Sequence, residues 1–248
     1  MGWFSEFVPV SVVRGIQLGL GLILLRTSTG YITEKIWLSA VRISIVLVFM
    51  FIKNNYSVPD FSAFIVMFLG IAYELYAHGI PEIEIMKFPA FQFSELADFP
   101  KGIILGTLPQ FFLSVGNAIL ATSLLFEDLL DAEVSPDRLS QSMGIMSIFS
   151  SLFGGFSACH GSGGLSGQYR FGARTGGSNL ILGTIYFGVA VIAGSTSFLG
   201  FFPLSVLGAL LVFIALELGL AAKKTDSWPL TLTVGSCHFL SILQSVLP

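Results

Sequence analysis

Residues 157–178 read SACHGSGGLSGQYRFGARTGGS, with seven glycines between Gly161 and Gly177. Apolar stretches flank this segment on both sides. Backbone this polar cannot face lipid, because irregular backbone at membrane depth persists only where it is buried in protein or lines a cavity. If the surrounding chain lies in a membrane, the segment is therefore expected to be buried in protein or to line a cavity, whether it crosses the membrane or dips in and returns on the same side.

The composition of the chain indicates that it does lie in a membrane. Its 248 residues are 54% hydrophobic and only 11% charged, with a mean hydropathy of +0.84, whereas soluble domains carry about 25% charged residues. Only lipid can solvate so apolar a surface. The composition excludes a soluble globular protein, and we expect an all-α polytopic integral protein of the cell membrane, surrounded by membrane lipid.

Charge and cysteine content exclude other classes of partner. The net charge is −3 and there is no basic tract, which argues against a nucleic-acid partner. Cys159 and Cys237 lie far apart in apolar stretches, which argues against a disulfide or a thiolate metal site. No metal and no cofactor are expected.

Long apolar runs broken by charges or proline predict about eight membrane-spanning helices. The longest polar stretch, from His78 to Lys101, is expected to be an external loop between two bundles of spans. A second acidic stretch, residues 127–137, ends in Ser135-Pro136-Asp137, which is typical of a helix start. The predicted spans are Val8–Leu25, Ile36–Ile52, Phe61–Ala77, Ile103–Phe126, Met143–Phe156, Asn179–Gly194, Phe202–Leu218 and Leu230–Leu247.

The glycine-rich segment has the features of an anion site. Its small residues allow a ligand to approach the main chain, and residues 165–171 can form a short helix whose N-terminus attracts anions. Broken helices of this kind hold substrates in many secondary transporters. The alternative is that the glycines serve tight helix packing, and that a lone His160 is a structural residue. The candidate ligand-binding residues are Gly161, Ser162, Gly163, Gly164, Leu165 and His160.

The predicted span Ile103–Phe126 carries a second polar feature. Pro109 interrupts it, and Gln110, Ser114 and Asn117 follow at the spacing of one helical face. Polar side chains aligned inside an apolar span usually face a bundle interior or a cavity. We add these three residues to the candidate site, with Asn117 as the strongest of them. The alternative is that they only hydrogen-bond to neighbouring helices.

Charged residues in or near the spans have a simpler interpretation. Arg14 and Arg42 are expected to extend to the membrane interface, and the same interpretation applies to Glu74. A proton-relay role for Glu74 or Glu217 is the alternative. The topology depends on the glycine-rich segment: if it crosses the membrane, Arg170 and Arg174 share a side with Lys53 and Arg138, and otherwise they lie opposite them.

The sequence resembles a known family in three segments. The run CHGSGGLSGQYRFGARTG over residues 159–176 looks like the signature of the molybdate transporter family, a branch of the sulfate permease (SulP) superfamily. Two other segments, VPVSVVRGIQLGLG from Val8 and FPLSVLGALL from Phe202, are similar to that family. Leu108-Pro109-Gln110 with Asn117 resembles its core helix less closely.

The resemblance implies an inverted-repeat fold with a substrate-carrying core and a gate or scaffold domain. In such a fold the anion lies between two half-helices, each preceded by a short strand. Here Ser157–His160 would be one strand and Gly163–Ala173 its half-helix, so that the segment would cross the membrane. The implied division of the chain is 1–77 as a three-span gate- or scaffold-like bundle, 78–102 as the polar loop, 103–194 as the core with the anion site, and 195–248 as C-terminal spans.

The resemblance covers only the later part of the family's fold, and the spans that supply the opposing half-helix have no counterpart here. The expectation is that the chain is truncated, or that a homodimer or a second chain completes the site. The leading functional hypothesis is a secondary transporter of molybdate or sulfate, working by an elevator-like or rocking motion, and not an enzyme. The alternatives are an intramembrane serine hydrolase using Ser162 and His238, and a non-transporting membrane subunit.

Overall fold

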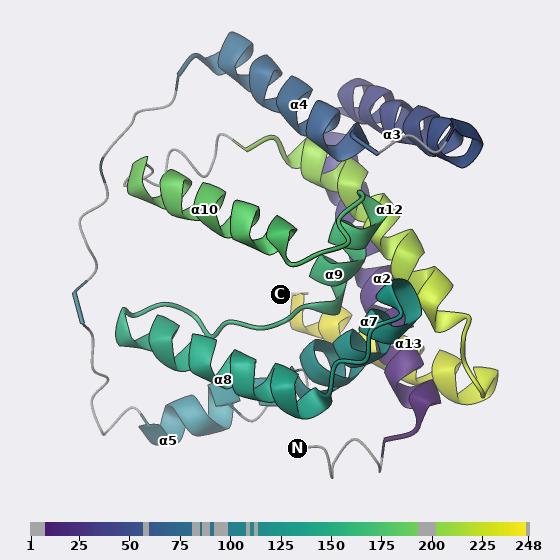
Figure 1. Ribbon diagram of the computed structural model, residues 1–248, viewed down its shortest axis with the longest axis vertical. Coiled ribbons are helices and arrows are strands. Elements are labelled where there is room, and N and C mark those ends of the chain that lie inside the picture. The colour runs from purple at the N-terminus through teal and green to yellow at the C-terminus, as the bar shows by residue number, and fades with distance from the viewer. Residues whose placement is uncertain are drawn as a thin grey trace. The chain divides into compact units, whose positions relative to one another are not determined.

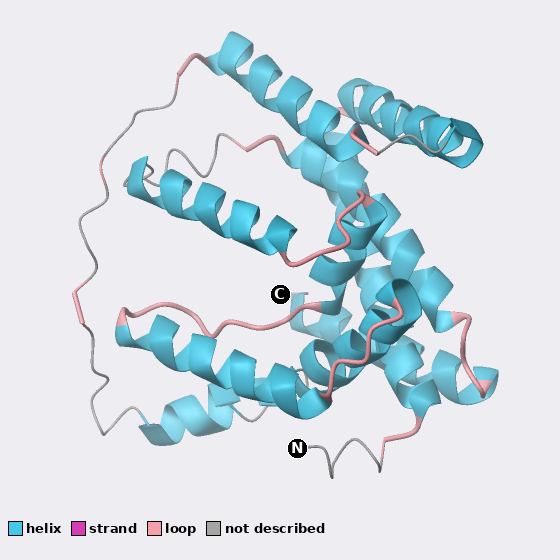
Figure 2. Cartoon of the chain, viewed as in Figure 1, coloured by secondary structure: helices cyan, strands magenta, loops and turns pink. Residues whose placement is uncertain are grey.

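The computed structural model of the protein describes residues 8–56, 60–80, 85, 90–91, 99–107, 110–111, 114–192 and 202–246. The secondary structure of these residues is helical, with short connecting loops (Figures 1 and 2). The elements are α2 Val10–Glu34, α3 Ile36–Tyr56, α4 Ser62–His78, α5 Phe99–Lys101, η2 Gly102–Thr107, η3 Ser114–Ala121, α7 Thr122–Leu130, α8 Pro136–Leu152, α9 Ser162–Arg170, α10 Gly177–Ile192, α12 Leu204–Ala222 and α13 Trp228–Val246.

Most described residues of the eight predicted spans are helical, in agreement with the expected all-α membrane fold. Three described helices are long and apolar enough to cross a membrane, namely Val10–Glu34, Ile36–Lys53 and Leu204–Ala222, and two shorter apolar helices are α4 and α10. Most of the predicted external loop, and Pro109, lie outside the described residues. The four-part division of the chain stays a prediction.

The predicted span Ile103–Phe126 is not a regular α-helix. Its described parts include two π-helical stretches, η2 and η3, before the chain continues as α7. A π-helix is wound more widely than an α-helix, and such segments are frequent at functional sites. The winding matters here because η3 contains Asn117.

Local sequence signals explain where two helices begin and end. Ser135 caps α8 by accepting a hydrogen bond from the main-chain N–H of Arg138, and Pro136 occupies the first turn, as predicted. Helix α9 ends at Arg170, before the predicted end at Ala173, because Gly172 has a φ of +100°. The N–H of Ala173 then donates to the carbonyl of Gln168 (2.9 Å), which closes a glycine cap.

The short strand predicted over Ser157–His160 is instead irregular backbone. Side-chain hydroxyls take the place of a strand partner there. Ser147 of α8 donates to the carbonyl of Ala158 (3.0 Å), and Thr122 of α7 donates to the carbonyl of His160 (3.0 Å). Two main-chain carbonyls of this segment are therefore hydrogen-bonded without a sheet.

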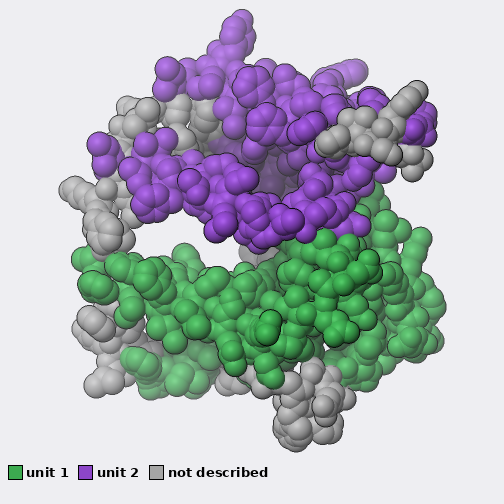
Figure 3. All heavy atoms as spheres, in the orientation of Figure 1, with its two compact units in different colours: residues 1–23, 89–166, 216–248 green, residues 24–88, 167–215 purple. Residues whose placement is uncertain are grey.

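The described chain divides into two compact units of discontinuous segments: residues 1–23, 89–166 and 216–248 form unit 1, and residues 24–88 and 167–215 form unit 2 (Figure 3). In unit 1, Val13, Leu120 and Ala121 form a buried cluster. In unit 2, the buried cluster is Val46, Val66, Val206 and Phe213. Each unit thus has its own apolar core.

The interfacial interpretation of the charged residues is wrong for Arg14, Arg42 and Glu74. Both arginines are only 4% exposed. Arg14 forms an ion pair with Asp128, Arg42 donates to the hydroxyl of Ser205, and Glu74 lies 3.1 Å from Lys35 Nζ and 2.9 Å from His78 Nδ1. Each of these three side chains has a partner on another helix or one turn along its own helix. A buried charge is tolerated when it is paired in this way.

Candidate functional site

Helix α9 starts with main-chain donors that have no acceptor inside the helix. The N–H groups of Gly164 and Leu165 donate to the carbonyl of Gly161, at 3.0 and 3.2 Å. This leaves Ser162 and Gly163 with N–H groups for which the helix offers no carbonyl. Of the donors predicted between Gly161 and Leu165, those of Gly164 and Leu165 are therefore already used by the chain itself.

Asn117 lies against the first residue of α9. The hydroxyl of Ser162, which is fully buried, donates to Oδ1 of Asn117. This contact joins residues 45 positions apart and places the Asn117 side chain next to the helix start. With Oδ1 acting as acceptor, the amide group Nδ2 keeps its two donors. The structure thus brings together two residues that the sequence analysis placed in separate segments.

Thr122 is a further residue of this site that the sequence analysis missed. Its hydroxyl lies 3.2 Å from the carbonyl of Asn117 and 3.0 Å from the carbonyl of His160, and Thr122 is 2% exposed. Thr122 follows Asn117 by five residues, a spacing that faces the same side only in a π-helix. No α-helical pattern could have revealed it.

His160 and the remaining candidates contact other groups. Nε2 of His160 lies 3.2 Å from the hydroxyl of Ser142 on α8, which is the contact of a structural histidine. Gln110 Nε2 donates weakly to Ser114 Oγ at 3.4 Å. Among the described residues neither Gln110 nor Ser114 hydrogen-bonds to α9.

Gly161 and Gly164, at the start of α9, are not packing residues. A Cβ at Gly164 would meet no atom within 4 Å, and one at Gly161 would meet only Gly164 N at 3.9 Å. Gly167 differs, because a Cβ there would lie 2.9 Å from Ile214 in unit 2. The packing interpretation therefore applies to Gly167, while Gly161 and Gly164 leave the main chain accessible.

A buried ion pair supports the backbone next to the site. Arg14 of α2 pairs with Asp128 of α7, and Lys224 Nζ lies 3.0 Å from the same carboxylate. Arg14 also donates to Gln17 (3.1 Å), whose amide donates to the carbonyl of Ala121 (3.1 Å). Ala121 precedes Thr122, so this network holds the turn from which Thr122 reaches the site.

The serine hydrolase hypothesis is not supported by this geometry. Ser162 gives its proton to Asn117, whereas the ring of His238 packs against Gly19 and its buried Nε2 has no hydrogen-bond partner. A nucleophilic serine needs a base within hydrogen-bond reach. The arrangement at α9 offers neutral hydrogen-bond donors, which suit anion binding rather than covalent chemistry.

The sequence of the chain is related to molybdate transporters. Residues 102–218 match the family described as "Molybdate transporter of MFS superfamily". Molybdate transporter 2 of Arabidopsis thaliana is 30% identical over 279 residues, which cover 92% of this chain and 60% of that protein. Molybdate transporter 1 of the same plant is 40% identical over 129 residues, covering 51% of this chain and 28% of that protein. The chain thus spans only part of the length of these relatives.

The fold is shared with a solved membrane transporter structure. The transmembrane domain of a cyanobacterium bicarbonate transporter, BicA, matches 100% of this chain and 71% of its own, with a TM-score of 0.66 and 19% identity. The relatives are transporters by name, in agreement with the prediction that the chain is not an enzyme. The expected resemblance to molybdate transporters is therefore confirmed: this chain is an integral membrane protein that is similar in sequence to part of these transporters and shares its all-α fold with the transmembrane domain of BicA.

Proposed function

We propose that this chain carries the anion-binding half-helix of a membrane transporter for a tetrahedral oxyanion. The observation that carries the proposal is the start of α9, where the N–H groups of Ser162 and Gly163 have no acceptor in the helix and Gly164 has open space beside it. The positive end of the helix dipole attracts an anion without a cationic side chain.

Five residues have a defined part in this proposal. The main-chain N–H groups of Ser162 and Gly163 bind the anion, and Asn117 donates from Nδ2. The hydroxyl of Ser162 positions Asn117, because its own proton is already donated to Oδ1. His160 and Thr122 act indirectly by holding the backbone that leads into α9.

Molybdate is the substrate that we propose, with sulfate as a competing anion. The names of the relatives support molybdate. Main-chain N–H donors recognise the charge and the oxygens of an anion, and both dianions are tetrahedral. We therefore expect sulfate to compete with molybdate at this site.

The test is anion binding and uptake by the complete natural protein that contains this chain. Gly163→Pro removes one N–H donor in the first helical turn, a place where proline is tolerated, and Gly163→Ala is the matched control that keeps the donor. We expect Gly163→Pro to weaken molybdate protection against thermal unfolding at least tenfold in concentration, because hydrogen bonds to charged groups contribute about 1.5–3 kcal/mol.

Uptake of labelled molybdate should fall in parallel in the Gly163→Pro variant, while its unfolding temperature without anion stays close to that of Gly163→Ala. Equal molybdate protection in the two variants would mean that the main-chain donors do not bind the anion. Absence of both uptake and protection in the unmodified protein would remove the transport proposal and favour a non-transporting subunit.

A further inference from the structure

Unit 2 contains a cavity that is separate from the residues of the candidate anion site. Its volume is about 640 Å³, within the range of about 300–1,000 Å³ typical of small-molecule sites. The residues that line it include Lys53, Asp60, Phe61, Phe64, Phe171 and Arg174. They come from the end of α3, the start of α4 and the turn that follows α9.

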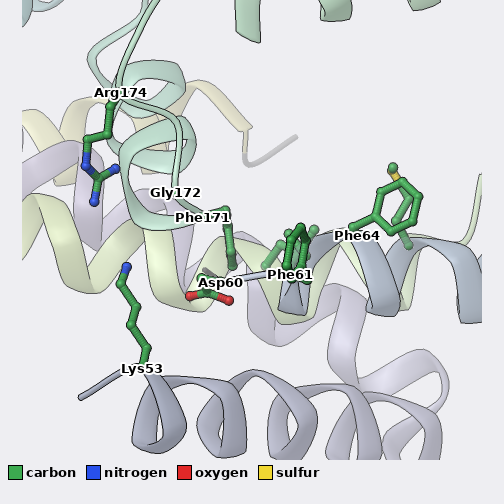
Figure 4. Close-up of a pocket in the computed structure, with 10 residues that line it drawn as sticks. Lys53, Asp60, Phe61, Phe64, Phe171, Gly172 and Arg174 are labelled. Carbon is green, nitrogen blue, oxygen red and sulfur yellow. The ribbon is translucent and has the colours of Figure 1, made fainter. Parts of the chain in front are cut away.

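Two cations face this cavity from different elements. Figure 4 shows the side chains of Lys53 and Arg174 directed toward each other, with the carboxylate of Asp60 nearby. Arg174 is held by two hydrogen bonds from Nη1, to the carbonyls of Tyr169 (2.6 Å) and Ala173 (2.7 Å). Among the described residues no carboxylate forms an ion pair with Lys53 or Arg174. Two such cations favour a phosphate group between them.

Asp60 adds an acceptor of a different kind. Asp60 is 8% exposed. Its Oδ1 accepts hydrogen bonds from the N–H (3.0 Å) and the hydroxyl (2.6 Å) of Ser62 at the start of α4. Oδ2 is buried and accepts no hydrogen bond from any described residue. A buried carboxylate oxygen without a donor is unfavourable, and an ammonium group in the cavity would supply the missing donor.

The cavity lies at one end of the helices α3 and α4. Lys53 lies three residues before the end of α3 and Asp60 two residues before the start of α4, so we expect both at the same membrane face. Arg174 lines the same cavity, which agrees with the topology in which the glycine-rich segment crosses the membrane. The rings of Phe61 and Phe64 are 56% and 65% exposed, and at this depth they are available to acyl chains.

We propose that this cavity binds a phospholipid whose headgroup carries a primary amine, of the phosphatidylethanolamine type. The phosphate lies between Lys53 and Arg174, the ammonium donates to Oδ2 of Asp60, and an acyl chain follows Phe61 and Phe64. Phosphatidylcholine has the same phosphate, but its quaternary ammonium has no N–H to donate. The primary amine is therefore the recognised feature.

The test compares the two lipids on the purified full-length protein. Delipidated protein is offered equal amounts of phosphatidylethanolamine and phosphatidylcholine with identical acyl chains, and tightly bound lipid is identified by native mass spectrometry. We expect about tenfold preferential retention of phosphatidylethanolamine, as for one hydrogen bond to a charged group. Equal retention of both lipids would overturn the proposal without any variant being needed.

Variants assign the preference to residues. Asp60→Asn keeps an oxygen that can accept hydrogen bonds from Ser62. It should bring the ratio of retained phosphatidylethanolamine to retained phosphatidylcholine close to one, while the total amount of retained lipid changes little. Lys53→Gln combined with Arg174→Gln should lower retention of both lipids about tenfold or more. Lys223→Gln, an exposed lysine outside the cavity, should change neither quantity.

Two outcomes contradict the assignment. The first is an unchanged lipid preference in Asp60→Asn. The second is release of bound phosphatidylethanolamine when inorganic phosphate is added at a concentration equal to that of the lipid. That release would identify a site for a free anion rather than for a headgroup.

Discussion

Glycine has two opposite uses in this protein, and they occupy different regions. At Gly208 of α12 an added Cβ would lie 2.9 Å from Tyr31 Cβ and 3.2 Å from both Ile32 N and Ser28 O, so the glycine lets two helices touch. At Gly164 of α9 the same added atom would meet nothing within 4 Å. The space beside Gly208 is occupied by atoms of α2, whereas the space beside Gly164 is empty and leaves the main chain of α9 accessible.

This difference distinguishes positions that matter for the stability of the chain from positions that matter for anion binding. Close packing and buried ion pairs hold the helices of each unit together, so changes there should lower the free energy of unfolding. Gly164, in the first turn of α9, has open space beside it, so a change there should alter anion binding and leave stability nearly intact. Four substitutions, ordered by their expected effect on stability, test this division.

The largest loss of stability is expected for Asp128→Ala. The substitution leaves Arg14 buried without its carboxylate, and breaking a buried pair on one side costs about 3–5 kcal/mol. Equilibrium unfolding in mixed detergent micelles measures this loss. Glu127→Ala, at the exposed neighbouring position, serves as control and should change the free energy by less than about 0.5 kcal/mol. Equal behaviour of the two variants would show that the pair is not needed.

Gly208→Val should follow, with a loss of about 1–3 kcal/mol. The atoms that the new side chain meets include main-chain atoms of α2, which cannot rotate away. Gly219→Val is the matched control on the same helix, because a Cβ at Gly219 meets nothing within 4 Å. If both variants unfold at the same temperature, the packing role of Gly208 is wrong.

Thr122→Val should cost about 1 kcal/mol. The new side chain has nearly the same shape but cannot donate to the carbonyls of Asn117 and His160. We also expect weaker protection by molybdate, since these carbonyls hold the backbone on either side of the site. Thr233→Val, whose hydroxyl bonds only within its own exposed helix turn, should leave both measurements unchanged.

Gly164→Ala should have the smallest effect on stability, below about 0.5 kcal/mol, and yet should weaken molybdate binding. The methyl group enters the space through which an anion would approach the main chain of α9. Gly183→Ala, at a position on α10 with nothing within 4 Å, provides the control for both readouts. Normal molybdate protection in Gly164→Ala would remove the distinction between the two kinds of glycine.

Features that depend on local sequence were predicted well. The membrane fold and the positions of the eight spans follow from the length of apolar runs, and Ser135-Pro136 marks the start of α8 as expected. The end of α9 was misplaced because Gly172 adopts a positive φ. Arg170 and Arg174 therefore do not share a helical face: Arg170 lies over the ring of Phe213 at 5.8 Å, and Arg174 over that of Tyr169 at 3.8 Å.

The partners of the polar groups could not be predicted in the same way. Asn117 and Ser162 were placed in the same candidate site, but the sequence did not indicate the hydrogen bond that joins them. Arg14 was assigned to the membrane interface because its partner, Asp128, lies 114 positions away. Thr122 was overlooked because its spacing from Asn117 suits a π-helix.

The sequence by itself determined that this protein lies in a membrane, that it is built from helices and where a glycine-rich segment interrupts them. These properties depend on the transfer of each residue from water to lipid and on the backbone freedom of glycine, which are local. Only the tertiary structure decided which charges pair, which glycines are in contact with a neighbouring helix and which main-chain N–H groups of α9 have no acceptor in the helix. Those properties depend on distance and direction between groups far apart in the chain, because a hydrogen bond or an ion pair forms only where both partners are brought together.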